Sequence, residues 1–172
     1  EARILDGRVA VNGRVIHSPA LNVSTNDLVT VDNKPLPKLE PARLWRYYKP
    51  RGLSVSAREE KNRQTVFDKL PSHLPRVITV GRLDIDSEGL LLLTNDGDLA
   101  RHLELPSTGW SRKYRVRVQG NVREEPLAGL ANGVTIGDIR YGQVLANLDR
   151  QMASNAWLTL SIREGKNREI RR

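Results

Sequence analysis

Hydrophobic and polar residues alternate along much of this chain with the period of two that is typical of β-strands. The clearest alternation covers residues 112–118, where Tyr114 and two valines occupy one face and three cations the other. Residues 157–162 repeat the pattern. Further strands are predicted at residues 8–11, 14–16, 27–31, 44–48, 77–80 and 139–148, the last of them broken near Gly142.

Helices are expected to be few and short. One would be capped by Thr65, cover residues 66–70 and end at Pro71. A second would be capped by Asp98 and cover residues 99–103. Others are predicted at residues 1–5, ending at Gly7, at residues 124–132, ending at Asn132-Gly133, and from Glu169 onward.

The most unusual stretch is an acidic loop, residues 81–89, followed directly by four leucines at residues 90–93. The leucine run predicts a short strand that is buried on both faces. Asn95-Asp96-Gly97 then favours a turn. Asp84 would lie on a loop leading into a rigid strand. That is a suitable mounting for a reactive carboxylate, because the strand fixes it while the loop exposes it.

Three interpretations of this carboxylate compete. In the first, Asp84 is structural and pairs with Arg82 or another arginine, while Asp86 and Glu88 face water, since most charged groups are solvated. In the second, Asp84, Asp86 and Glu88 bind calcium, because they match alternate ligand positions of an EF-hand loop. Asn95 stands where that loop needs its final glutamate, however. In the third, Asp84 is a nucleophile or general base acting on a nucleic acid.

Composition favours a nucleic acid as the partner. The 172 residues carry a formal net charge of +8, and the pI is about 10.2, so a polyanion is expected to bind. No apolar run approaches the ~18 residues of a membrane span, and no signal-peptide pattern is present. The chain has no cysteine, its three histidines show no ligand spacing, and it has no phosphate-binding glycine loop. We expect a cytoplasmic protein without a metal or cofactor.

A proline-rich segment divides the chain. Residues 33–41 hold three prolines and two lysines, which predicts a stiff, extended linker and a domain boundary near residue 40. The first part, residues 1–39, is a small basic module with a hairpin turn at Asn12-Gly13. The second part is residues 40–172. Because the chain begins with glutamate and stops within a basic segment, both ends are expected to be cut.

The first part resembles the second half of an S4 RNA-binding domain. The similarity rests on Gly7-Arg8-Val9 and on Val11-Asn12-Gly13. It implies that the helical first half of such a domain lies before Glu1, so the module is expected to be a partial RNA-binding domain.

Five segments of the second part, in order, resemble a superfamily of ribosomal RNA pseudouridine synthases, the one typified by synthase A of the small ribosomal subunit. They are Lys49-Pro50-Arg51-Gly52, Gly81-Arg82-Leu83-Asp84, residues 89–97, Lys113-Tyr114-Arg115-Val116 and residues 164–172. Residues 65–71 resemble synthase B of the large ribosomal subunit, which modifies 23S rather than 16S rRNA. The resemblance implies an α+β fold with a mixed, mostly antiparallel sheet and an active site in a cleft across it.

The resemblance also implies a reaction, the isomerisation of uridine to pseudouridine within ribosomal RNA. No redox step or group transfer occurs in it, so no cofactor is expected. Asp84 would be essential, either as a nucleophile at C1′ or as a base acting on the sugar. Tyr114 would pack on the target uracil. Arg171 would form a salt bridge to Asp84, with Arg168 and Arg172 as alternatives for that role.

RNA contacts are expected from cations in and near these segments. Arg82 would help to extrude the target nucleotide and fill the gap that it leaves. The residues expected to bind RNA are Arg82, Lys49, Lys113, Arg115, Lys166, Arg168 and Arg172. A glycosidase-like carboxylate pair is not expected, because Asp86 lies only two positions after Asp84 and would point away from it.

A protein of another class remains as the alternative. It would be a non-catalytic rRNA-binding or ribosome-assembly protein that uses the S4-like module and the basic strands. The presence of both Asp84 and Tyr114 favours the enzyme. No long heptad pattern indicates a dimer, so we expect a monomer.

Overall fold

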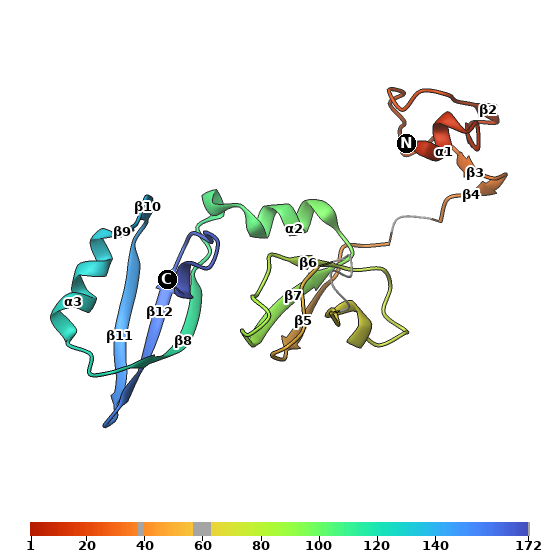
Figure 1. The fold of residues 1–172 in the computed structure, drawn as a ribbon. Helices are drawn as coiled ribbons and strands as arrows, with labels where there is room; N and C mark the ends of the chain where they lie inside the picture. Colours follow the sequence, from red (N-terminus) through yellow and green to blue (C-terminus); the bar gives the residue numbers. More distant parts are fainter. Residues whose placement is uncertain (38–39, 57–62, 172) are drawn as a thin grey trace. The chain divides into compact units, whose positions relative to one another are not determined.

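A computed structural model describes residues 1–37, 40–56 and 63–171 of the chain. They form two compact units, Glu1–Pro41 and Ala42–Arg172 (Figure 1). No helix in the part of the chain that is described is long and apolar enough to cross a membrane.

The first unit is a small antiparallel sheet with one helical turn, α1 (Ala2–Leu5). Its strand order is β2-β1-β3-β4. The strands are β1 (Val9–Val11), β2 (Arg14–Val15), β3 (Val29–Val31) and β4 (Lys34–Pro35). The predicted hairpin turn joins β1 to β2, with φ of 51° at Asn12 and 81° at Gly13. Asparagine and glycine suit a tight turn of this kind because both tolerate positive φ.

A second tight turn corrects the prediction of a linker from residue 33. Asp32 and Asn33 have φ of 52° and 62°, and they join β3 to β4. Asp and Asn adopt such angles more readily than other residues with a Cβ. Pro35 is accepted in β4 because this strand lies at the edge of the sheet, where a missing N–H breaks no internal ladder. Residues 38–39 of the expected linker lie outside the described residues.

The second unit begins with a three-stranded antiparallel sheet of order β5-β7-β6. Its strands are β5 (Leu44–Lys49), β6 (Ile78–Val80) and β7 (Gly89–Thr94). Leu91 and Leu93 of β7 are almost fully buried, in a core shared with Val66 and Val77. Leu90, by contrast, is 64% exposed, so the prediction of a strand buried on both faces was wrong. Alternate side chains point to opposite faces, and at Leu90 the second face is not covered.

One predicted cap and one predicted helix also need correction. The helix after β7 is α2 (Gly97–Glu104), and Asp96 rather than Asp98 caps it, with Oδ1 accepting the Leu99 N–H at 2.8 Å. Asp96 has the extended backbone that a cap requires, whereas Asp98 already lies in the first helical turn. After Thr65 the chain forms only a short 3₁₀ turn, η1 (Phe67–Lys69), instead of a helix over residues 66–70.

The second sheet of this unit has the order β11-β12-β8, and all of its pairs are antiparallel. Its strands are β8 (Arg112–Gln119), β11 (Val144–Gln151) and β12 (Asn155–Ile162). The alternation predicted for β8 is confirmed, because exposed and partly buried residues follow each other along its whole length.

Shorter elements complete the unit. They are η2 (Pro106–Thr108), α3 (Glu124–Gly129), η3 (Leu130–Asn132), the hairpin of β9 (Val134–Ile136) and β10 (Ile139–Tyr141), and η4 (Glu169–Arg171). α3 and η3 pack against β11, and α2 packs against β6 and β7. η4 follows β12 and returns the chain to the acidic loop between β6 and β7, where Arg171 meets Asp84.

Candidate active site

The acidic loop, residues 81–88, is held from behind by Lys49. Lys49 is fully buried, and its Nζ donates to the carbonyl oxygens of Ser87 at 2.8 Å, Asp84 at 3.1 Å and Ile85 at 3.4 Å. It also donates to the Pro50 carbonyl at 3.0 Å. The Gly52 N–H adds a further hydrogen bond to the Ile85 carbonyl at 2.7 Å. The loop backbone is therefore pinned by the end of β5 and the turn that follows it.

This placement overturns the RNA contact expected of Lys49. Burial lowers the pKa of its ammonium, while the nearby carboxylates of Asp86, Asp84 and Glu88 oppose that effect. A side chain with no exposed surface and four carbonyl acceptors cannot reach a phosphate. Lys49 instead positions the backbone that carries Asp84.

Asp84 faces the two arginines of the C-terminal segment. Its Oδ2 lies 3.8 Å from Nη1 of Arg171 and 4.0 Å from Nε of Arg168. The Asp84 side chain is 33% exposed, so it is partly shielded but open to a ligand. The salt bridge expected between Arg171 and Asp84 is present, and Arg168 shares it. The structural interpretation paired Asp84 with Arg82 or another arginine, and the arginines that pair with it lie more than eighty positions away in the chain.

Asp86 takes part in the same cluster, contrary to the prediction that it points away. Its Oδ2 lies 3.3 Å from Nη1 of Arg171, closer than Asp84. The chain turns here, since the Ser87 N–H donates to the Asp84 carbonyl at 3.0 Å. Even in an extended segment, residues two apart lie on one face. The two carboxylates therefore converge on one guanidinium.

Tyr114 lies in the electrostatic neighbourhood of this cluster. Burial raises the pKa of its hydroxyl, Arg112 opposes the shift, and the carboxylates of Glu169 and Asp84 add to it. The hydroxyl is therefore protonated at neutral pH. Tyr114 lies on the partly buried face of β8, and the exposed cations Lys113 and Arg115 lie on the opposite face.

Arg168 has an unusual backbone for a residue with a Cβ. Its φ is 55°, in the left-handed region, which costs about 1 kcal/mol for a residue other than glycine. The Arg171 N–H then donates to the Arg168 carbonyl at 2.9 Å and closes η4. This strained turn carries both arginines to Asp84, and strain of this kind is often found at functional sites.

The other expected RNA-binding residues are not all brought to Asp84. Arg82 is exposed on the acidic loop itself. Lys113 and Arg115 are exposed on the face of β8 opposite Tyr114. Arg115 stacks over Trp157 at 4.9 Å from the ring centroid and pairs with Asp149 at 3.7 Å.

Lys166 binds other parts of the same chain. Its Nζ pairs with Glu164 Oε2 at 2.9 Å and donates to the Arg140 carbonyl at 2.6 Å. Arg172 lies outside the described residues.

The calcium interpretation finds no support in the geometry. Within residues 1–37, 40–56 and 63–171, no group of three or more His, Cys, Asp or Glu side chains is placed to hold a metal ion. Asp84, Asp86 and Glu88 are all among these residues. Two of the three face Arg171 instead.

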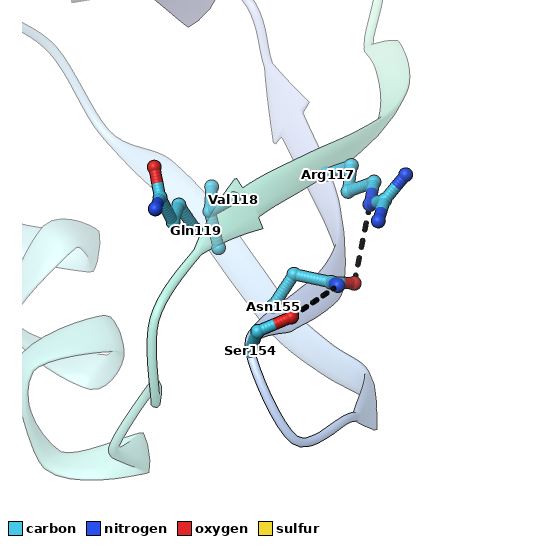
Figure 2. Close-up of a pocket in the computed structure, with 5 residues that line it drawn as sticks. All are labelled: Arg117, Val118, Gln119, Ser154 and Asn155. Carbon is cyan, nitrogen blue, oxygen red and sulfur yellow. Dashed lines mark hydrogen bonds between the residues drawn. The ribbon is translucent and has the colours of Figure 1, made fainter.

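A hollow of about 380 Å³ lies at the far end of the second sheet (Figure 2). Arg117, Val118, Gln119, Ser154 and Asn155 line it, and Figure 2 shows the Arg117 guanidinium donating to Asn155 Oδ1, 3.1 Å away. No candidate catalytic residue lines this hollow. We therefore assign the candidate active site to the cluster of charged side chains around Asp84 and not to this hollow.

Sequence reasoning missed one contact and one role. Asp86 was not expected to meet Arg171, and Lys49 was expected to bind RNA rather than to hold the acidic loop. The spacing of Asp84 and Asp86 was a usable signal for the first of these. Nothing in the order of residues indicates that Lys49 lies under the acidic loop, since the two meet only through the pairing of β5 with β7.

Comparison with known proteins adds a family to this geometry. Residues 43–172 match the family described as RNA pseudouridylate synthase. An "uncharacterized RNA pseudouridine synthase" of Rickettsia bellii is 48% identical over 172 residues, which are 100% of this chain and 74% of that protein. The ribosomal large subunit pseudouridine synthase B of Pseudomonas aeruginosa is 40% identical over 179 residues, covering 100% of this chain and 46% of that protein.

A solved structure agrees at the level of the fold. The crystal structure of a pseudouridylate synthase superposes with a TM-score of 0.64 at 24% sequence identity, covering 99% of this chain and 73% of the other. The expected α+β pseudouridine synthase fold is thereby confirmed, with antiparallel pairing throughout the named strands of the described residues.

Proposed function

Since this chain belongs to the RNA pseudouridylate synthase family, whose members are isomerases, we propose that it converts a uridine of 23S ribosomal RNA to pseudouridine with Asp84 as the essential carboxylate. The choice of 23S rRNA rests on the similarity to the ribosomal large subunit pseudouridine synthase B of Pseudomonas aeruginosa, Pasteurella multocida and Haemophilus influenzae, at 37–40% identity. This chain spans about half the length of those relatives.

One observation carries the proposal. The Oδ2 atom of Asp84 lies within 4.0 Å of both Arg168 and Arg171, on a loop that the buried Lys49 pins in place. Three segments far apart in the sequence thus present one carboxylate in a fixed position with cations beside it. Such fixed placement of a charged group is what catalysis on a bound nucleotide requires.

The proposed reaction breaks the N1–C1′ bond of uridine and joins C5 of the same uracil to C1′. The proton lost from C5 is balanced by one gained at N1. Asp84 attacks C1′ as a nucleophile or removes a proton from the sugar as a base. Arg171 and Arg168 hold the carboxylate in position. Tyr114 packs on the uracil, and Arg82 occupies the gap left by the flipped nucleotide. The isomerisation needs no redox agent and no group donor, so we invoke no cofactor.

The first unit would then help to bind the RNA substrate. Its hairpins and basic residues suit a partial S4-like RNA-binding module that ends at the boundary near residue 40, and the catalytic domain would follow it. Phosphate contacts from Lys113 and Arg115 on β8 would add affinity that falls with salt. We propose that the chain acts as a monomer on RNA in the cytoplasm.

Release of tritium from RNA labelled at uracil C5 tests the proposal. The chain and its Asp84→Asn variant are given 23S and 16S transcripts in separate reactions. The matched control is Asp138→Asn, because Asp138 is an exposed aspartate in the turn between β9 and β10. We expect release from 23S RNA by the wild type and by Asp138→Asn, with a loss of at least about 100-fold for Asp84→Asn.

Each other outcome has a defined meaning. Equal release by Asp84→Asn would exclude Asp84 as the catalytic carboxylate. Release from 16S alone would overturn the substrate but keep the reaction. RNA binding without release, from both transcripts, would favour a binding protein.

A further inference from the structure

The second sheet of the second unit, β11-β12-β8, is covered on one face and open on the other. On the central strand β12, Ala156, Leu158 and Ile162 are buried, whereas Trp157 and Thr159, which point the other way, are only partly covered. Because a central strand has neighbours on both sides, this exposure means that the second face is open among the described residues. The open face consists of Lys113, Arg115 and Arg117 of β8, Trp157 and Thr159 of β12, and Arg150 of β11.

Arg115 is held in place at the centre of the open face. Its guanidinium lies over the Trp157 ring, 4.9 Å from the ring centroid. Its Nε lies 3.7 Å from Oδ2 of Asp149, and the same oxygen accepts the hydroxyl of Thr159 at 2.9 Å. The Arg115 side chain is nevertheless 67% exposed. The guanidinium is thus supported by an indole and fixed by a carboxylate, with most of its surface left to a ligand.

A β-bulge places the charged groups around this pair. The register of β11 shifts between Leu148 and Arg150, so that Arg150 pairs with Trp157 and Asp149 is an extra residue. In an unbroken strand Arg150 would share the covered side with Leu148, because alternate residues point the same way. The bulge instead brings Arg150 to the open face and lets Asp149 reach Arg115.

The centre of the open face suits a planar ligand better than a phosphate. Asp149 lies beside Arg115 and offsets its charge, so this guanidinium attracts a phosphate less strongly than an unpaired arginine does. Its planar surface is still available, and unpaired bases stack on guanidinium planes as they do on aromatic rings. Trp157 supports the guanidinium, so less order has to be imposed when a base binds. The pair therefore forms a preorganised platform for one base.

Three further cations flank this platform. Lys113 and Arg117 are exposed two positions before and after Arg115, about 7 Å away along the strand. Arg117 is oriented by a hydrogen bond from its Nε to Oδ1 of the neutral Asn155 side chain, 3.1 Å away (Figure 2). Arg150 is exposed on β11. A stacking platform beside cations is the combination by which proteins bind single-stranded nucleic acid.

We propose that the open face binds a single-stranded segment of the substrate RNA, with one unpaired base stacked on Arg115 and phosphates paired with the flanking cations. The inference rests on the proposed function, since it takes RNA as the ligand, and it adds a base to the phosphate contact named for Arg115. The open face lies on the side of β8 opposite Tyr114, so the base bound here is not the uridine that reaches Asp84. An acidic protein segment would pair with the cations but has no planar base to stack on Arg115.

NMR on the intact chain labelled with ¹⁵N tests where the RNA binds. The probe is octaadenylate, a single strand that has unpaired bases and contains no uridine for the proposed reaction. We expect its addition to shift the indole N–H signal of Trp157 and the Nε–H signal of Arg115. A duplex RNA with the same number of phosphates keeps its bases inside the helix and should shift both signals much less. Unmoved signals, or equal shifts with the duplex, would overturn the base platform.

Arg115→Lys separates stacking from charge, because lysine keeps the charge and removes the plane. Fluorescence anisotropy of labelled octaadenylate should give a Kd at least about 5-fold higher for this variant. The dependence of Kd on salt should not change, since no charge is lost. The matched control is Arg101→Lys, the same change at an exposed arginine of α2, which should bind as the wild type does. Equal affinities for Arg115→Lys and the wild type would contradict the stacked base.

The flanking cations and the class of partner have tests of their own. Lys113→Gln removes one phosphate contact and should lower the slope of log Kd against log salt by about 0.7. An unchanged slope would exclude Lys113 from the surface. A polyglutamate peptide of the same length as the RNA should leave the Trp157 signal in place. A shift with the peptide and none with octaadenylate would assign the open face to an acidic protein and overturn the inference.

The outcomes also separate this inference from the proposed function. With 23S transcripts, the loss in Arg115→Lys should appear in the KM for tritium release rather than in kcat, because Arg115 does not face Asp84. Binding of octaadenylate at Trp157 by a chain that never releases tritium would refute the proposed reaction and keep the surface. Tritium release by a chain whose Trp157 and Arg115 signals stay unmoved would keep the reaction and refute the surface.

Discussion

Nη1 of Arg171 lies 3.3 Å from Oδ2 of Asp86 and 3.8 Å from Oδ2 of Asp84, so one guanidinium serves two carboxylates. Asp86 is the more exposed of the two, with 57% of its side chain accessible against 33% for Asp84. The carboxylate nearer to Arg171, that of Asp86, is thus the one that solvent screens more. If Asp86 is replaced by an uncharged residue, Arg171 can pair with Asp84 alone.

Asp86→Asn should therefore change the rate of pseudouridine formation by no more than a few-fold. An exposed ion pair contributes little, about 0.2–1 kcal/mol, and Arg171 retains its contact with Asp84. Arg171→Met removes the partner of both carboxylates and should lower kcat by about 100-fold, because Asp84 loses its orientation. Single-turnover rates on labelled RNA measure both. A loss in Asp86→Asn as large as that in Arg171→Met would show that Asp86 is itself catalytic.

Lys49→Met should destabilise the fold by about 3 kcal/mol, since four partly buried carbonyls lose their donor at once. The control is Lys113→Met, where the same change is made on the exposed face of β8 and should cost within about 0.5 kcal/mol. Urea denaturation of the two variants and the wild type gives the free energies of unfolding. Equal midpoints for Lys49→Met and the wild type would contradict the view that Lys49 holds the acidic loop.

The sequence reveals which residues form a strand more readily than it reveals which of their side chains other elements cover. The alternation of β8 was predictable because a strand with one covered face leaves its mark on every second residue. The leucines of β7 carry no such mark, so nothing in the run shows that Leu90 lies open while Leu91 and Leu93 are buried. Asp96 and Asp98 are both acceptable caps by residue type, and only the extended backbone at Asp96 decides between them.

The candidate site shows the same division. The meeting of Asp84 with Arg171 was expected only from a family resemblance, because eighty-six residues separate them and no periodicity connects them. Lys49 attracted attention as a cation, and cations are usually exposed. Its burial follows from the position of β5 beside β7. That pairing depends on the whole sheet, so the residues around Lys49 do not reveal it.

Acid should weaken the second unit in part through Asp68. This carboxylate accepts the Thr65 N–H at 2.7 Å and the Thr65 hydroxyl at 3.0 Å, and these hydrogen bonds lower its pKa from the ordinary value of 3.8. Because the pKa is lower in the folded state, the stabilisation is fully present above about pH 4 and is lost as the pH falls through the folded value. Val66, which Thr65 precedes, is completely buried in the core.

Asp68→Ala should accordingly lower the Tm at pH 7, and the difference from the wild type should shrink towards zero near pH 2. Asp138→Ala, at an exposed turn, provides the control and should follow the wild-type Tm at both pH values. Thermal unfolding recorded from pH 2 to 7 measures the effect. A difference that stays constant over this range would mean that packing of the side chain, rather than its ionised hydrogen bonds, matters at this position.

Tyr114 offers a test of whether its hydroxyl takes part in the reaction. The pKa of this hydroxyl is raised by burial and by the carboxylates of Glu169 and Asp84, so it remains a proton donor across the neutral range. Tyr114→Phe keeps the ring on which the uracil would stack and removes only the hydroxyl. If the hydroxyl moves a proton, kcat should fall by about 100-fold while KM for RNA stays nearly constant. Tyr114→Ala should impair both constants, because stacking on a base contributes about 1–3 kcal/mol. Steady-state kinetics of tritium release separate the two effects, and a Tyr114→Phe variant with unchanged kcat would restrict Tyr114 to packing against the base.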